Sequence, residues 1–283
     1  MRAAIALLVA FVASLTAAGA DSGRPLRPVT SAWTVEIGSA HEADTYLSPL
    51  HYSGWHAGFN YERFQAMRFD PERWVMRLDI GATVDRTDNP ARNASMTGAS
   101  LRASWSMMRR FAIPAVSGLR VAAGGITELD AGALILSRNG NNPVSARAAW
   151  TVGVTGMATW STRLGRLPVT LRYQPALPVI GAFFSPDYGE LYYEISLGNH
   201  SNLAHCAWFG NRFAMSNLVT ADLRFGATAL RLGYSGRIIS SKVNNIVTRS
   251  FTHALVIGVS GEWLSLSPVH TPTPETRIIS AYY

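Results

Sequence analysis

An alternation of apolar and polar residues with a period of two recurs along this chain, and it constrains the fold more than any other feature. Between Trp74 and Asp85 every second residue is apolar, while the positions between them include arginine, aspartate and threonine. Such a segment predicts a β-strand whose two faces meet different surroundings. Lipid on one face and water or polar protein on the other would suit it, so the alternation predicts a membrane barrel.

The first twenty residues have the three parts of a secretory signal peptide. Arg2 precedes an apolar run over 3–12, which is followed by small residues at 18–20. The run is too short for a stable transmembrane helix, and no later stretch reaches about 18 uninterrupted apolar residues. We therefore expect residues 1–20 to be removed and residues 21–283 to form one domain. Cys206 is the only cysteine, so no internal disulfide can stabilise it.

The period-two pattern predicts about twelve strands, an even number that lets the first and last strands pair in a single closed antiparallel transmembrane β-barrel. The terminal Tyr283 resembles the aromatic residue that barrel-assembly machinery recognises at the end of a last strand. The predicted strands cover residues 33–38, 54–64, 74–84, 99–107, 119–123, 148–160, 169–173, 191–197, 219–225, 230–234, 251–259 and 277–283.

A secreted β-sandwich is the rival architecture, because a strand packed on a second sheet shows the same alternation. The placement of tryptophan favours the membrane barrel. Five tryptophans lie on the apolar parity, several near predicted strand ends, where amphipathic rings settle at the lipid headgroups. They are Trp55, Trp74, Trp105, Trp150 and Trp160.

Two blocks of sequence, 46–54 and 178–195, resemble an uncharacterised family of exported Bacteroidetes proteins, domain-of-unknown-function family 3316. The resemblance continues through 230–234 and 251–263, so it spans most of the chain after the signal peptide. It implies an outer-membrane barrel of a Gram-negative bacterium. It brings no catalytic residues.

Charge restricts the partners. Removal of residues 1–20 takes away one arginine and no acid, so the net charge falls from +7 to +6. The arginines are scattered singly over alternating strands, whereas nucleic-acid binding needs a clustered basic patch. We therefore expect no nucleic-acid partner. The expected partners are outer-membrane lipid and, during biogenesis, the barrel-assembly machinery.

If the apolar parity faces lipid, the other parity faces the lumen and carries nearly balanced charges. Matched charges in a narrow barrel can pair and fill it, which favours an ion-paired lumen over a narrow channel for a small polar solute. The lumen-facing candidates are Glu62, Arg77, Asp79, Arg102, Glu190, Glu194, Asp222, Arg224 and Arg231.

A weak catalytic alternative lies in the tetrapeptide 199–202. A histidine beside a serine resembles the catalytic pair of outer-membrane acyl hydrolases such as phospholipase A and lipid A deacylase. However, His200 and Ser201 are adjacent, so on a strand they would point to opposite faces. In a hydrolase, Glu194 or Asp187 would be the third residue that orients the imidazole. A polar turn at a strand end is the alternative explanation of the tetrapeptide.

Metal ions and cofactors are not expected. The seven histidines show no tight ligand pair, and the glycines at 124–125 are followed neither by a phosphate-binding lysine nor by a helix. The aromatic loop 183–189 suits either a packed turn at the barrel rim or a lid over the mouth for a sugar or lipid.

These observations predict an outer-membrane barrel without enzymatic activity, which has a structural role or forms a narrow, transport-associated barrel. Two alternatives stay open. One is an envelope-lipid acyl hydrolase that uses Ser201 and His200, and the other is an accessory subunit of an uptake or secretion complex.

Overall fold

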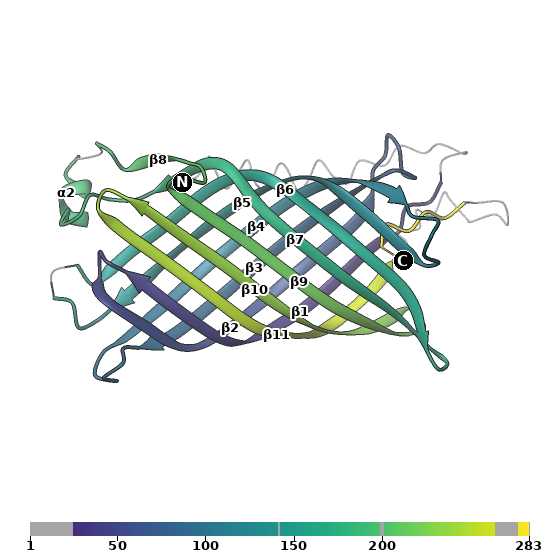
Figure 1. Ribbon diagram of the computed structural model, residues 1–283, viewed down its shortest axis with the longest axis horizontal. Helices are drawn as coiled ribbons and strands as arrows, with labels where there is room; N and C mark the ends of the chain where they lie inside the picture. Colours follow the sequence, from purple (N-terminus) through teal and green to yellow (C-terminus); the bar gives the residue numbers. More distant parts are fainter. Residues whose placement is uncertain (1–24, 141, 199–200, 264–276, 283) are drawn as a thin grey trace.

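The computed structural model describes residues 25–140, 142–198, 201–263 and 277–282. Ten long strands form a closed antiparallel barrel, and one short strand, β8, lies outside it (Figure 1). The strands are β1 (Val29–Asp44), β2 (Ser48–Ala66), β3 (Trp74–Asp88), β4 (Ser95–Ala112), β5 (Leu119–Leu136), β6 (Val144–Leu164), β7 (Leu167–Phe184), β8 (Ala204–Ala207), β9 (Arg212–Phe225), β10 (Thr228–Val243) and β11 (Ile246–Trp263).

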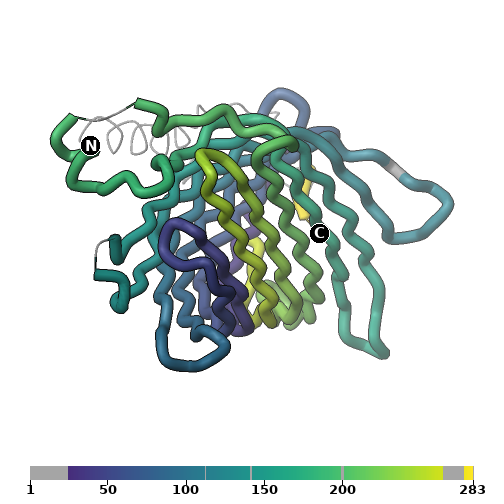
Figure 2. The backbone as a smooth tube through the Cα atoms, turned by 60° about the vertical axis from the view of Figure 1, so that its left-hand side comes forward, coloured from purple at the N-terminus to yellow at the C-terminus, as the bar shows by residue number. Residues whose placement is uncertain are grey.

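The ring closes through two pairings. β1 pairs with β11 along its whole length, from Val29 opposite Trp263 to Asp44 opposite Thr248. β6 pairs with β7, which completes the order β6-β5-β4-β3-β2-β1-β11-β10-β9-β7. The tube in Figure 2 shows these strands side by side in one tilted wall. The predicted closed antiparallel barrel is thus confirmed.

Side chains alternate between the two sides of this wall. In β1, for example, Thr34 and Glu36 are buried, whereas Val35 and Ile37 are exposed on the outer surface. The same outward parity exposes Trp55, Trp150 and Trp160. The outside of the barrel is therefore apolar and its inside is polar, the reverse of a water-soluble sandwich. No helix among the described residues is long and apolar enough to cross a membrane.

The two ends of the barrel differ in their connections. At one end, here the terminal end, β1 begins, β11 finishes, and the connections 67–73, 113–118, 165–166 and 226–227 turn the chain. At the other, the loop end, lie the connections 45–47, 89–94, 137–143, 185–211 and 244–245. The connection 185–211 is the longest and carries α2 (Tyr192–Ser196) and β8 (Figures 1 and 2).

The predicted strand at 191–197 is wrong, because this segment lies in that connection and forms α2. The backbone N–H of Leu191 donates to the Glu194 carboxylate, which closes the first turn of the helix. Gly189 and Gly198 flank it with φ angles of 88° and 108°, a left-handed conformation that breaks an extended strand. Period two over a short segment with no neighbouring strand did not suffice to make a strand.

The predicted last strand at 277–283 is also wrong. Ile278 makes one parallel bridge with Leu26, and the chain then turns so that Ala281 and Tyr282 are buried. Because β11 already pairs with β1, no free barrel edge remains for a further strand. Tyr283 lies outside the described residues. The other ten predicted strands fall within observed strands, so the count is ten rather than twelve.

Candidate functional site

An apolar floor closes the lumen near the terminal end. Tyr282, which is 1% exposed, packs its ring 5.2 Å from that of Phe64. The guanidinium groups of Arg172 and Arg231 lie 5.3 and 5.5 Å from the centre of the Tyr282 ring. The other members of this cluster come from β3, β4, β5 and β6, so the tail after β11 fills the middle of a ring of strands. They are Val75, Met108, Ala122 and Met157, and Ala281 of the tail completes the cluster.

An ion-pair network, here the Glu62 network, lies directly above this floor. Glu62 on β2 accepts hydrogen bonds from Arg77 at 2.6 Å, Arg172 at 2.9 Å and Arg231 at 2.5 Å. Arg77 comes from the adjacent strand β3, whereas Arg172 and Arg231 come from β7 and β10 and reach Glu62 across the lumen. All four side chains are at least 90% buried. A carboxylate held by three guanidinium groups fixes the width of the barrel at this level.

Two further carboxylates balance the charge of this network. Asp222 accepts a bidentate pair of hydrogen bonds from Arg231, at 2.7 and 2.8 Å. Asp79 accepts from Arg77 at 3.1 Å and from Arg102 at 3.2 Å. Burial of these charges is tolerated because each has an opposite charge and a hydrogen bond.

Two cavities lie between the Glu62 network and the loop end. The lower has a volume of about 50 Å³ and the upper about 130 Å³, and both are lined by Glu36, Asn60, Arg102 and Ser235. The amide nitrogen and oxygen of the buried Gln174, on the wall of the lower cavity, have no hydrogen-bond partner among the described residues. Polar walls of this kind suit ordered water.

Charges around the upper cavity are mostly paired. The pairs are His56 with Asp85 at 2.5 Å and Glu36 at 3.6 Å, Arg237 with Glu128 at 2.6 Å and Asp130 at 2.7 Å, and Arg147 with Glu42 at 3.0 Å and Asp44 at 3.5 Å. These pairs set six carboxylates against His56 and two arginines, and Arg102 and Arg212 on the same wall bring the count to six acidic and five basic side chains. This near balance leaves no large surplus of one sign around the cavity, whereas a pore selective for one sign of ion requires such a surplus.

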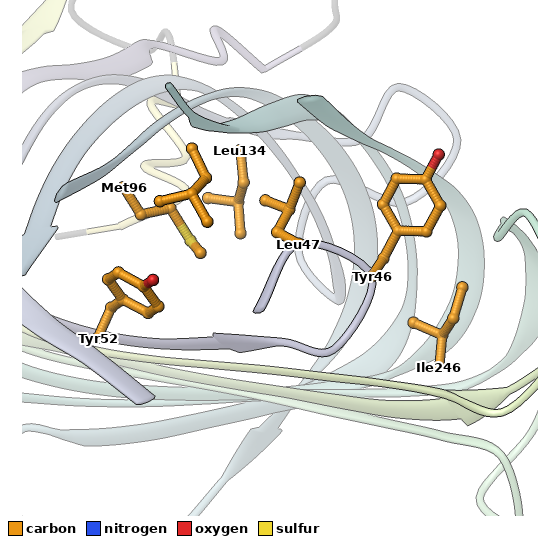
Figure 3. Close-up of a cluster of buried hydrophobic side chains, with 7 residues drawn as sticks. Tyr46, Leu47, Tyr52, Met96, Leu134 and Ile246 are labelled. Carbon is orange, nitrogen blue, oxygen red and sulfur yellow. The ribbon is translucent and has the colours of Figure 1, made fainter. Parts of the chain in front are cut away.

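An apolar roof covers the upper cavity at the loop end. Tyr46 and Leu47, in the connection between β1 and β2, turn inward toward side chains from the surrounding wall (Figure 3). The Tyr46 hydroxyl donates to the backbone oxygen of Glu190 at 2.6 Å, which ties this turn to the long connection 185–211. Burial raises the pKa of the Tyr46 phenol. The remaining members of the roof are Tyr52, Met96, Leu134, Leu136 and Ile246.

With this geometry described, the chain can be compared with known proteins. A family model described as a protein of unknown function, DUF3316, matches residues 4–269. The chain belongs to the DUF3316 family. This confirms the resemblance seen in the sequence. None of the curated protein sequences matches this chain.

Three solved structures similar to this DUF3316 protein are a protease, an autotransporter translocator domain and a FadL homologue. The outer membrane protease OmpT from Escherichia coli is 8% identical with a TM-score of 0.49, over 83% of this chain and 97% of that one. The translocator domain of the autotransporter NalP from Neisseria meningitidis is 10% identical with a TM-score of 0.34, over 93% and 97%. A FadL homologue from Pseudomonas aeruginosa is 8% identical with a TM-score of 0.29, over 84% and 90%. These similarities assign no residue of this chain a role.

The structure brings six of the predicted lumen-facing residues of this DUF3316 protein together and separates the other three. Glu62, Arg77, Asp79, Arg102, Asp222 and Arg231 join the Glu62 network. Arg224 shares the inward parity of β9 but lies at the terminal end. Glu190 and Glu194 were expected on a strand and instead lie in the connection 185–211, because α2 replaces that strand. Glu190 is buried there, whereas Glu194 is exposed.

Of the hydrolase alternative, the structure describes Ser201 and the two acids, and these lie in the connection 185–211. Ser201 is exposed in the connection 185–211, and His200 lies outside the described residues. The two acids considered as triad members make local contacts: Asp187 accepts from the Asn202 side chain, and Glu194 accepts from the Leu191 backbone. Among the described residues, no group of three or more His, Cys, Asp or Glu side chains could hold a metal ion.

Sequence reasoning missed most of the charged residues around the upper cavity. Glu36 lay within a predicted strand, on its polar parity, so the pattern already contained the signal for it. The others fall beyond the predicted strand ends, where the real strands continue, or were not counted as charged. They are Glu42, Asp44, His56, Glu128 and Asp130.

Proposed function

We propose that this DUF3316 protein is an outer-membrane β-barrel whose lumen is closed to the free passage of ions, with a structural or transport-associated role in the envelope. The observation that carries the proposal is the Glu62 network, in which arginines from three other strands meet one carboxylate in the lumen. The apolar floor and roof support it from either side. Together they narrow the lumen to cavities of about 50 and 130 Å³ in place of a water-filled channel.

The orientation follows from the connections. Outer-membrane barrels have short turns on the periplasmic side and longer loops outside the cell. We place the terminal end in the periplasm and the loop end, with the connection 185–211, at the cell surface. The outward apolar parity would contact outer-membrane lipid. Removal of residues 1–20 and insertion by the barrel-assembly machinery are part of this proposal.

Conductance tests the closed lumen directly. The mature chain, residues 21–283, would be refolded, its fold checked by a heat-dependent shift in gel mobility, and its current recorded across a planar bilayer. We expect a folded but silent barrel. Steady channels formed by the unmodified chain would contradict the proposal.

A designed variant shows that the assay can detect an open lumen. Replacing Glu62 and Arg172 by serine removes one charge of each sign and leaves the Arg77–Asp79 and Arg231–Asp222 pairs intact. Ending this variant at Trp263 also removes Tyr282 from the floor. We expect current through this variant, because water can then occupy the space that the side chains filled.

A further inference from the structure

The barrel wall is interrupted between β7 and β9 near the loop end. β7 pairs with β9 over residues 169–176 and with β8 over residues 181–184. Between these ladders, residues 177–180 of β7 lie opposite residues 208–215, and neither segment pairs with the other. Pro178 has no backbone N–H to offer to a ladder at this point. The wall therefore has a seam that strand pairing does not hold together.

Arg212, the first residue of β9, lies at this seam and lines the upper cavity. Its guanidinium lies 5.5 Å from the centre of the Phe183 ring, on β7 across the seam. The other arginines on the cavity wall are Arg102, Arg147 and Arg237, and each of them forms an ion pair.

Arg212 differs from these three arginines. It forms no ion pair with any described residue within 4 Å, whereas each of the other three does. Its buried Nε has no hydrogen-bond partner among the described residues, which is also true of Nε of Arg102 and Arg147, so the missing ion pair is what sets Arg212 apart. The carboxylates that attract the Arg212 guanidinium, Asp130 and Glu128, both form their ion pairs with Arg237. A half-buried guanidinium with unused donors is suited to an anion that comes from outside the chain.

The surroundings of Arg212 are apolar on the side of the seam. Phe183 packs with Ala149 and Ala207, and Val243 completes this cluster. On the outer surface, Ile180, Trp208, Phe209 and Phe213 are exposed beside the interruption. A molecule at this place would meet a cation at one end and apolar surface at the other.

We propose that the upper cavity binds a small amphiphile with a carboxylate head, which pairs with Arg212 while its apolar end lies along Phe183 toward the seam. The cavity volume of about 130 Å³ sets the size. An engineered apolar cavity of about 150 Å³ accepts benzene, so a chain of about six carbons fits here. A planar carboxylate matches the fork of donors on the guanidinium. This site goes beyond the closed barrel proposed above and does not require ion flow.

Binding of hexanoate tests the proposal. The full mature chain would be reconstituted in phosphatidylcholine nanodiscs and titrated calorimetrically with hexanoate, hexylammonium and hexanol, with empty nanodiscs as the blank. We expect saturable binding of hexanoate only. Arg212→Gln should weaken it at least about tenfold, because it removes charged hydrogen bonds, and Arg212→Lys should weaken it less. Arg249→Gln, at an exposed arginine near the loop end, is the matched control and should bind like the parent.

A second variant keeps the test decisive if Arg212→Gln does not fold. Ser241 lines the upper cavity, so Ser241→Leu should fill it and abolish hexanoate binding without touching Arg212. The proposal would be overturned if hexanoate did not bind the parent saturably or if hexylammonium bound equally well. Unchanged hexanoate binding to a folded Arg212→Gln or Ser241→Leu barrel would also overturn it. Conductance of the parent would overturn only the closed lumen, so the two failures are distinguishable.

Discussion

At the residue scale, the lumen depends on charges that meet across the barrel as well as between neighbours on one strand or on adjacent strands. Glu62 is paired in the sheet with Asp79 on β3 and Ala32 on β1, yet its carboxylate contacts arginines from β7 and β10 as well. Long arginine side chains make this possible, because a guanidinium on the far wall can reach the centre of the lumen. Removal of a shared partner therefore affects several strands at once.

Glu62→Gln tests the energetic weight of this network. The substitution keeps the shape of the side chain but leaves Arg77, Arg172 and Arg231 without their common carboxylate. Loss of one partner from a buried ion pair costs about 3 to 5 kcal/mol, so we expect a loss of that order in the free energy of unfolding. Urea titration of the barrel in lipid vesicles, followed by tryptophan fluorescence, measures it.

The control for this substitution is Glu72→Gln. Glu72 also forms an ion pair, with Arg277, but both side chains are more than half exposed. Surface pairs contribute about 0 to 1 kcal/mol, so the control should change the unfolding free energy by no more than that. Equal losses in the two variants would show that the Glu62 network holds the barrel no better than a surface pair does.

At the element scale, the sequence predicted the barrel and ten of its strands because the alternation reflects a wall with different surroundings on its two sides. The errors at 191–197 and 277–283 have a common cause. Residues 191–197 alternate and residues 277–283 end in an aromatic residue, but a strand needs a neighbour with free backbone groups, and neither segment has one within the barrel. Whether a segment finds a pairing partner depends on the whole closed ring, so the sequence of that segment alone cannot predict it.

The candidate site was predictable only in part for a related reason. Parity identified Glu62, Arg77 and Asp222 as inward residues, but it could not show that the pairs on β2–β3 and β9–β10 meet, since Glu62 and Arg231 join them from strands far apart in the sequence. The role of Arg212 could not be predicted from the sequence, because it depends on the absence of an ion pair. Its missing ion pair and its place beside an interrupted ladder exist only in the assembled wall.

The chain after β11 acts as a structural element although it is not a strand. Tyr282→Ala would remove the ring that fills the floor, next to Phe64 and below two guanidinium groups. Truncation of a buried aromatic residue costs about 3 to 5 kcal/mol, and we expect a destabilisation of that order in urea titration. Tyr193→Ala is the matched control, because Tyr193 is 68% exposed, and it should leave the unfolding midpoint nearly unchanged. Equal midpoints for the two variants would contradict a packed floor.

At the scale of the whole molecule, closure explains both the position of the charges and the position of the apolar residues. Each strand of the ring has a neighbour on both sides, so no long edge is left to pair with another chain. The inner surface is small enough for its charges to pair, and the outer surface is large and apolar. In water this outer surface would be a severe liability, whereas in a bilayer it is the surface that lipid contacts.

Arginine scanning of the outer surface tests the membrane location of the barrel. Ile257 lies near the middle of β11, opposite Val35 on β1, and is 52% exposed. An arginine in the middle of a transmembrane strand costs about 2 to 4 kcal/mol, but about 0 to 1 kcal/mol near the interface. Leu164 is even more exposed, at 72%, but lies at the terminal end beside the turn 165–166. Ile257→Arg should therefore lower the unfolding free energy in vesicles by about 2 to 4 kcal/mol, and Leu164→Arg by far less. A water-exposed barrel would tolerate both substitutions alike, because exposure rather than depth would then decide the cost.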